Sequence, residues 1–404
     1  YVVVQRTPFA TIGANHNLAS LGKLLDQSLS VSSGGISDLI DKLDTTALNA
    51  AGVSLGTSNG ILSTARSYAA INATLQGLNP AGYAELANLG FDRLLEIQLG
   101  LVNHLRTLAG PQIEDAKAGE LAAWTSAYGG WTRRDGEASY GSAGYSSSNF
   151  GNITGVEKRI GALTIGLAGA LGSSSATLGS GMGSVSTDSW HAGVYGSTPM
   201  ELAGYEIFAD AALAFGNGDT TFKRDVSVPG ISGGASTSVK GENSEWFMQL
   251  GGAFPLRTGD NSLTVTPSMH LLLAGFTQRA LSEPSMNGFG ALVGNQTETS
   301  ASVRTGVQFA KMMKLASRET RFSASLDWVH AFDSSRRGVD ISLNGTSGGG
   351  ARFESSKAGT EAARLGLGGE MVLTRWTRLR INLDEQVQAN QSSSIGSISI
   401  GVQF

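Results

Sequence analysis

Residues 395–404 alternate between apolar side chains and small or polar ones, and the alternation reaches the terminal aromatic residue. Successive side chains of a strand point to opposite faces, so Ile398, Ile400, Val402 and Phe404 form one apolar face. A soluble domain rarely ends on an apolar strand, because its unpaired edge promotes aggregation. A strand that closes a barrel in lipid has good reason to end this way. The pattern therefore indicates a membrane β-barrel.

The same period of two recurs along the chain from residue 121. Trp190 and Val194 fall opposite His191, for example, and Leu379 falls opposite Arg380. We expect twelve antiparallel strands, an even number, as single-chain bacterial barrels have. The predicted strands span residues 121–133, 144–157, 161–175, 184–198, 203–217, 240–254, 262–277, 298–310, 320–332, 352–373, 376–388 and 393–404.

Short and long predicted connections mostly alternate along the chain. Outer-membrane barrels have this pattern, with short turns at one membrane face and long loops at the other. Short ones fall near 158–160, 199–202, 255–261, 311–319 and 374–375. Longer ones, rich in Gly, Ser and Asn, fall near 134–143, 218–239, 278–297 and 333–351, with 176–183 and 389–392 as brief exceptions on the long side. Aromatic residues are candidates for the girdles at the two membrane interfaces. They are Trp124, Trp131, Trp190, Tyr195, Tyr205, Phe215, Trp246, Trp328 and Trp376.

The face opposite the apolar one carries many charges. Burying them unpaired in a soluble β-sandwich would cost several kcal/mol each. A water-filled barrel lumen removes that cost, so we expect them to face a lumen. The predicted lumen-facing charges are Glu245, Arg304, Asp327, Arg364, Glu370, Arg378, Arg380 and Asp384.

Residues 1–110 have a different pattern, which is mainly helical after a strand-like start at residues 1–4. Asn79-Pro80 marks the start of a helix that can continue to Gly110-Pro111. About 30 helical residues span roughly 45 Å, enough to cross a membrane, but this helix is too polar to face lipid. Its polar residues include Glu85, Asp92, Arg93, Glu96, Asn103, His104 and Arg106.

Such a helix either lies in a polar channel or packs on a soluble core. A helix is about 10–12 Å across and nearly fills a twelve-stranded barrel, so we expect residues 80–108 to plug the pore. The predicted domains are therefore residues 1–110, a helical region that ends in the plug, and residues 111–404, the barrel.

Composition supports these expectations. The chain has 404 residues, too many for one typical domain, with no cysteine for thiolate chemistry or disulfides. No run of about 18 apolar residues predicts a transmembrane helix. The net charge of −4 gives no support for nucleic-acid binding. No signal peptide is visible at Tyr1, so we expect a mature or truncated piece.

Three segments resemble type V autotransporters of Gram-negative bacteria, and the resemblance covers essentially the whole chain. Leu78-Asn-Pro-Ala-Gly-Tyr-Ala-Glu-Leu86 is similar to the helical segment before the translocator domain. Ala123-Trp124-Thr-Ser-Ala-Tyr128-Gly-Gly-Trp131 resembles its first strand. The pattern Ile398, Ile400, Val402, Phe404 resembles the signal that the outer-membrane barrel assembly machinery recognises.

The resemblance implies a barrel in the outer membrane that exports its own N-terminal passenger to the cell surface and keeps a helix in the pore. Residues 1–78 would then be the end of the passenger. The implied partners are outer-membrane lipids, the barrel assembly machinery, periplasmic chaperones and the passenger, without nucleic acid, metal or cofactor, and the barrel is expected to be a monomer. Some members cut themselves at an asparagine in the pore. Here Asn103 is followed by His104 rather than by a second asparagine, so we expect an attached passenger and no enzyme activity.

Other interpretations remain open. An outer-membrane porin or solute channel with a helical plug is the alternative function. Arg378 and Arg380 predict either a clamp on Glu96 or Asp92 of the plug helix, or an anion filter. Ser58 and Ser347 lie in G-x-S-x-G matches, which chance explains in a chain with 55 glycines. The five histidines, His16, His104, His191, His270 and His330, show no metal-ligand spacing.

Overall fold

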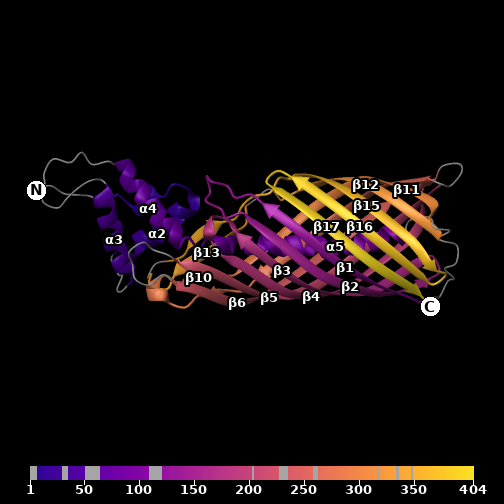
Figure 1. The fold of residues 1–404 in the computed structure, drawn as a ribbon, viewed down its shortest axis with the longest axis horizontal. Helices are drawn as coiled ribbons and strands as arrows, with labels where there is room; N and C mark the ends of the chain where they lie inside the picture. The colour runs from indigo at the N-terminus through magenta and orange to yellow at the C-terminus, as the bar shows by residue number, and fades with distance from the viewer. Residues whose placement is uncertain are drawn as a thin grey trace, which may run out of the picture.

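The computed structural model describes residues 7–29, 35–50, 64–108, 121–202, 204–226, 235–257, 263–315, 318–333, 336–346 and 349–404. These residues form a long β-barrel with a group of helices at one end, and one further helix runs inside the barrel (Figure 1). The predicted strand at residues 1–4 and the two serines Ser58 and Ser347 of the G-x-S-x-G matches lie outside the described residues.

The barrel wall has twelve antiparallel strands that follow one another around the ring in chain order. Pairing between β1 and β17 brings the first and last strands together, and pairing between β8 and β11 completes the ring. The strands are β1 (Leu121–Arg134), β2 (Tyr145–Ile160), β3 (Leu163–Leu178), β4 (Ser184–Leu202), β5 (Tyr205–Val226), β6 (Ala235–Ala253), β8 (Leu263–Gln278), β11 (Gln296–Leu315), β12 (Arg318–Ala331), β15 (Glu361–Thr374), β16 (Thr377–Gln388) and β17 (Gln391–Gln403). The two-residue strand β7 (Leu256–Arg257) lies beside β8.

The prediction of twelve strands in a closed barrel is confirmed, but several boundaries were wrong, and two regions differ most. The strand predicted at 352–373 begins only at Glu361, because residues 351–354 belong to a separate sheet. The connection predicted at 218–239 is mostly strand, since β5 and β6 keep pairing from Asn217↔Ser244 out to Val226↔Ala235. This extension carries the wall well beyond the length that a bilayer requires.

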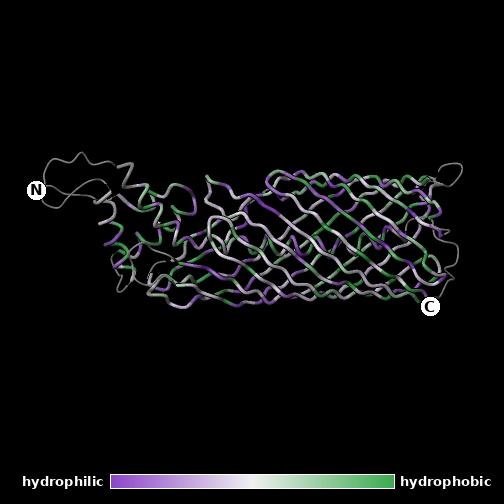
Figure 2. Tube along the Cα trace, viewed as in Figure 1, coloured by the Kyte–Doolittle hydropathy of each residue, from purple (hydrophilic) through white to green (hydrophobic). Residues whose placement is uncertain are grey.

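The outer surface of the barrel is apolar and the lumen is polar. Leu171, Leu326 and Leu383 are more than half exposed on the outside, whereas Arg364 and Glu245 are buried inside. Figure 2 shows the apolar residues along the strands of the wall. Of the predicted girdle residues, Trp124 and Tyr195 were wrong, because both are buried in the lumen. Trp124 lies seven residues before the exposed Trp131 on one strand, and an odd spacing puts two side chains on opposite faces.

Four short strands from the connections between β8 and β11 and between β12 and β15 form a second sheet above one end of the barrel, here called the cap sheet. It has the order β14-β13-β10-β9 and was not predicted. Its strands are β9 (Leu281–Ser282), β10 (Ala291–Val293), β13 (Gly338–Leu343) and β14 (Ala351–Glu354), with the 3₁₀ turn η3 (Met286–Gly288) between β9 and β10. A further 3₁₀ turn, η2 (Gly179–Gly181), lies between β3 and β4.

The N-terminal helices pack on the cap sheet and form the helical layer. They are α1 (Phe9–Ile12), α2 (His16–Ser28), α3 (Gly35–Ala50), α4 (Thr64–Leu78) and η1 (Ala81–Glu85), followed by α5 (Leu86–Leu108) in the lumen. Leu21 and Leu39 of the helices share one buried apolar cluster with Ile341 and Phe353 of the cap sheet. None of the described helices is long and apolar enough to cross a membrane.

Specific polar contacts fix the helical layer to the cap sheet. The buried Asn17 amide donates to Glu354 O (2.8 Å) and accepts from Glu354 N (2.9 Å), so it imitates a strand pairing. Tyr83 of η1 stacks on Phe222, and its hydroxyl donates to Glu283 Oε1 (2.7 Å). Arg224 of β5 pairs with the same carboxylate and donates to Leu78 O (2.9 Å). These contacts fix the point at which the chain enters the barrel.

Candidate functional site

The central feature of the barrel is α5, which lies in the lumen and contacts β1, β2, β3, β4, β6, β8 and β11. The helix predicted at 80–108 is therefore present, although its first turn is the 3₁₀ segment η1. Leu94, Ile97, Leu101 and Leu105 recur at helical spacing and form one apolar stripe. They pack against inward-facing wall residues, namely Trp124, Tyr128, Ile153, Ala170, Tyr195, Ala212, Ala214, Phe247 and Ala274.

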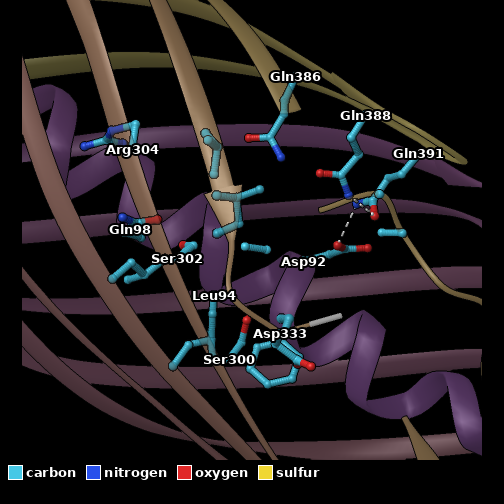
Figure 3. Close-up of a pocket in the computed structure, with 18 of the residues that line it drawn as sticks. Asp92, Leu94, Gln98, Ser300, Ser302, Arg304, Asp333, Gln386, Gln388 and Gln391 are labelled. Carbon is cyan, nitrogen blue, oxygen red and sulfur yellow. Dashed lines mark hydrogen bonds between the residues drawn. The ribbon is translucent and has the colours of Figure 1, made fainter. Parts of the chain in front are cut away.

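Two acids of α5 are bound to the wall near the long-connection end. Asp92 accepts from Tyr145 Oη (2.5 Å) and from Gln391 Nε2 (3.0 Å), and Figure 3 shows it beside Gln391. Glu96 accepts from Asn149 Nδ2 (2.6 Å). Because all these groups are buried, each hydrogen bond replaces one that water would have made. The acids therefore hold the helix at a defined depth and rotation.

Arg93 is the most deeply paired cation of α5. It forms an ion pair with Glu245 of β6, and it lies 3.4 Å from Ser174 Oγ. Glu245 also lies 3.0 Å from His191 Nε2 on β4, and its side chain has no exposed surface. One helix residue is thus connected to three wall strands, β3, β4 and β6.

The last turns of α5 carry a second set of wall contacts. Asn103 Nδ2 donates to Asp384 Oδ2 (3.0 Å), and Arg106 makes two hydrogen bonds to Asp327 (2.9 and 3.1 Å). His104 Nε2 lies 2.7 Å from Glu157 Oε2, and its ring stacks on Trp124 at 4.3 Å. Contacts on both sides of the lumen therefore fix this end of the helix.

Glycines allow the helix and the wall to approach closely. A Cβ atom on Gly130 of β1 would lie 2.2 Å from Glu96 Oε1, and one on Gly90 of α5 would lie 2.2 Å from the Phe276 ring. A Cβ on Gly100 would lie 2.5 Å from Ile153. Larger residues at these positions would push the helix off its wall contacts, so the lumen fits this helix sterically as well as chemically.

The structure places seven of the eight predicted wall charges in the lumen as buried residues, and Arg378 is half-buried. Four of them face α5 directly: Glu245, Asp327, Arg380 and Asp384 contact Arg93, Arg106, His104 and Asn103. Arg364 pairs with Asp384 at 2.7 Å, and Glu370 pairs with Arg321 and Arg380 at 3.1 and 3.3 Å. Arg304 makes no ion pair with a described residue within 4.0 Å.

The predicted clamp of Arg378 and Arg380 on Glu96 or Asp92 is wrong in its partners. Arg380 donates instead to His104 Nδ1 (3.0 Å), three turns further along α5 than Asp92. The error is one of register, since a sequence without coordinates does not give the depth of the helix in the pore. Sequence reasoning also missed the acid Glu157 and the neutral partners Tyr145, Asn149 and Gln249. Their positions on the inward-facing side of β2 and β6, which the alternation along each strand sets, were the available signal.

Glu85 sits where η1 meets the cap sheet, outside the strands of the wall, and has no exposed surface. It accepts from Ser356 N (2.7 Å), from Ser356 Oγ (3.0 Å) and from Asn88 Nδ2 (2.7 Å). Burial raises the pKa of this carboxyl above its usual value, although Arg134 and these donors oppose the rise. The protonated form is therefore favoured more strongly in the folded protein than in the unfolded chain.

This shift predicts a pH dependence for the cap. A carboxyl with a raised pKa contributes stability below its unfolded value of about 4.3, and the contribution is lost as pH rises through the folded value. We therefore expect the unfolding temperature of Glu85→Gln to rise relative to that of the unaltered chain as pH increases from about 4 to 7. Thermal unfolding in detergent, followed by circular dichroism, measures this difference. A constant difference between the two proteins across this range would contradict the assignment.

The five histidines lie apart from one another, and each lies near the carboxylate of one Asp or Glu. His270 lies 2.9 Å from Asp210, His330 lies 2.6 Å from Glu361, and His16 lies 4.0 Å from Glu354. Among the residues that the structure describes, no three His, Asp or Glu side chains form a group that could hold a metal ion.

Comparisons with known proteins agree with this geometry. The sequence matches a family model described as autotransporter beta-domain over residues 123–384. The structure is similar to the translocator domain of autotransporter NalP from Neisseria meningitidis, with 13% identity, a TM-score of 0.57, and coverage of 78% of this chain and 97% of that one. It is also similar to the beta domain of the Bordetella autotransporter BrkA, with 16% identity, a TM-score of 0.50, and coverage of 71% and 100%. No curated protein sequence matches the chain.

The structural likenesses, at these identities, show the fold. The family match covers well over half of the sequence and ends within β16. A closed barrel with an apolar exterior, preceded by a helix that occupies its lumen, is consistent with that match. The chain therefore belongs to the autotransporter β-domain family, and it is an outer-membrane translocator.

Proposed function

We propose that the barrel exports the N-terminal part of its own chain to the cell surface and that α5 then stays in the pore as a plug. Residues 1–110 would be the end of the passenger and its linker, and residues 111–404 the translocator. The barrel would act as a monomer, delivered by periplasmic chaperones and inserted by the outer-membrane assembly machinery. The passenger would remain attached.

One observation carries this proposal: α5 lies in the lumen, immediately before the first strand, with buried polar contacts to the wall around it. The chain passes from the helical layer into the lumen as α5 and reaches β1 at the short-turn end. Its N-terminal part therefore lies outside the pore, at the end with the long connections. The sequence at Asn103 supports an attached passenger, because Asn103 is followed by His104 rather than by a second asparagine.

Export is tested by fusing a short epitope to the N-terminus and expressing the chain in a Gram-negative host. We expect the epitope to be accessible to antibody and protease on intact cells and to migrate with the barrel as one full-length band. A matched variant that lacks residues 391–404 cannot pair β17 with β1 and should show no surface epitope. An epitope that stays protected in cells whose barrel is assembled would overturn the proposal.

The terminal residue is a second test, directed at the assembly machinery. Phe404 is 69% exposed on the outer surface, and its backbone N–H donates to Leu121 O (2.8 Å). Phe404→Ala keeps that backbone bond, so we expect normal refolding in detergent but several-fold less barrel in the outer membrane. Gln403→Ala, one residue earlier on the same strand, serves as the control. An equal loss in detergent and in cells would assign Phe404 to stability instead of recognition.

The alternative function, a porin or solute channel, requires a different arrangement of α5 in the lumen. A channel needs a continuous path past the helix, whereas the apolar stripe of α5 packs tightly on one side of the wall. Conductance of the full chain in planar bilayers separates the two functions. A large steady conductance with the helical region intact would favour the channel.

A further inference from the structure

The lumen is not filled evenly, because α5 packs against the wall on one side and leaves a cavity on the other. The cavity has a volume of about 170 Å³ and lies between α5 and strands β8, β11, β12, β15 and β16. Figure 3 shows Arg304 and Gln98 toward one end of it, and Asp92 with Gln388 and Gln391 toward the other. A cavity of roughly 150 Å³ is large enough for a benzene-sized molecule.

Arg304 is one of several cavity residues with buried nitrogens that have no hydrogen-bond partner among the described residues. Arg134, Arg337 and His270 are others. Arg304 is only 7% exposed, it lines the cavity, and its Nε and Nη2 atoms have no hydrogen-bond partner among the described residues. Arg364, which lines the same cavity, has an unpartnered Nε. Guanidinium nitrogens only donate, so a molecule that satisfies them must offer acceptors.

The wall carboxylates nearby are already engaged with other partners. Asp327 binds Arg106, and Asp384 binds Arg364 and Asn103. Asp210 accepts from Gln249 and lies 2.9 Å from His270, the cross-strand neighbour of Arg304. Asp92 and Asp333 line the cavity as well, but Asp92 is bound to Tyr145 and Gln391, and Asp333 to Arg337. Arg304 thus lacks an anionic partner of its own.

The helix contributes an apolar surface to the same space. Phe91 and Leu95 lie one turn apart on α5, both line the cavity, and both are only half-buried. Gln98 continues this face of the helix and is bonded to Gln249 (2.7 Å). Arg337, which also lines the cavity, lies over one face of the Phe91 ring at 4.2 Å. Apolar side chains and buried cations around one space suit a ligand that has one apolar and one anionic part.

We propose that this cavity binds a small organic monocarboxylate with a compact apolar body, whose carboxylate is held by Arg304. The planar guanidinium offers a fork that matches a carboxylate. The apolar body would lie against Phe91 and Leu95. The site belongs to the plugged barrel, because the helix supplies part of its wall.

Equilibrium binding to the full-length folded chain tests the site, with benzoate as the probe and benzamide as its uncharged counterpart of the same shape. Titration calorimetry in detergent should give benzoate an affinity at least about tenfold higher, since a charge-assisted hydrogen bond contributes about that factor or more. Equal affinities, or no binding of benzoate, would overturn the proposal. Chloride should compete weakly, and competition at equal concentration would show a site for simple inorganic anions instead.

Substitution of Arg304 tests the contact itself. Arg304→Gln should weaken benzoate binding at least about tenfold and leave benzamide binding within about twofold. Arg304→Lys keeps the charge without the fork and should lie between the two. Arg321→Gln is the matched control, because Arg321 lies in the same lumen, pairs with Glu370 and does not line the cavity. Heat-modifiable migration checks that each variant is folded. If Arg304→Gln does not fold, the benzoate–benzamide comparison on the unaltered chain decides.

Discussion

Removing residues 1–110 is expected to increase the single-channel conductance of the barrel several-fold in planar bilayers. The reason is steric, because α5 occupies the lumen and a helix with its side chains is about 10–12 Å across. Its removal also frees the lumen-facing Glu245, Asp327 and Asp384, which then line a hydrated pore. The conductance of the shortened barrel should therefore be both larger and steadier than that of the full chain.

A shorter deletion is the matched control for this measurement. A variant without residues 1–78 loses the helices α1 to α4 but keeps η1 and α5, and we expect it to stay near the low conductance of the full chain. If this variant conducts as well as the larger deletion, the helical layer closes the pore and α5 does not. If neither deletion changes conductance, the pore is not plugged by the N-terminal region at all.

The fold was predictable where one local rule decided the outcome. In β16 the alternation of Leu379, Ile381 and Leu383 with Arg380 sets both the strand and its inward face, and the structure has it so. The cap sheet was not predictable in this way. Its strands are two to six residues long, and they pair across the sequence distance between β10 and β13, which no local period reveals.

The pore contacts were predictable in kind but not in pairing. Parity within each strand placed Asp327 and Asp384 inside, and helical spacing placed Asn103 and Arg106 on α5. Which of these residues meet depends on the depth and rotation of α5. Packing sets both, through the apolar stripe and the close approach at Gly90 and Gly130. Parity could also have excluded Trp124 from the girdle, because it lies an odd number of residues from Trp131.

Arg93→Met is expected to destabilise the plugged barrel by about 3–5 kcal/mol. The substitution leaves the fully buried carboxylate of Glu245 without its guanidinium, and only His191 remains beside it at 3.0 Å. An uncompensated buried charge costs much more than the net contribution of the pair that it replaces. The double variant Arg93→Met/Glu245→Gln removes the charge as well, so most of the stability should return. Urea titrations, followed by heat-modifiable migration on gels, measure the stability of the single and the double variant.

Arg133→Met is the control, since Arg133 lies on the outer face of β1 in a pair with Asp135 and its side chain is 76% exposed. Exposed pairs contribute little, so this variant should stay within about 0.5 kcal/mol of the unaltered chain. A loss at Arg93 no larger than at Arg133 would mean that α5 lodges in the lumen without being bound to it. Recovery in the double variant would instead locate the loss in the buried Glu245 charge, and would make the ion pair a determinant of where the helix stops in the pore.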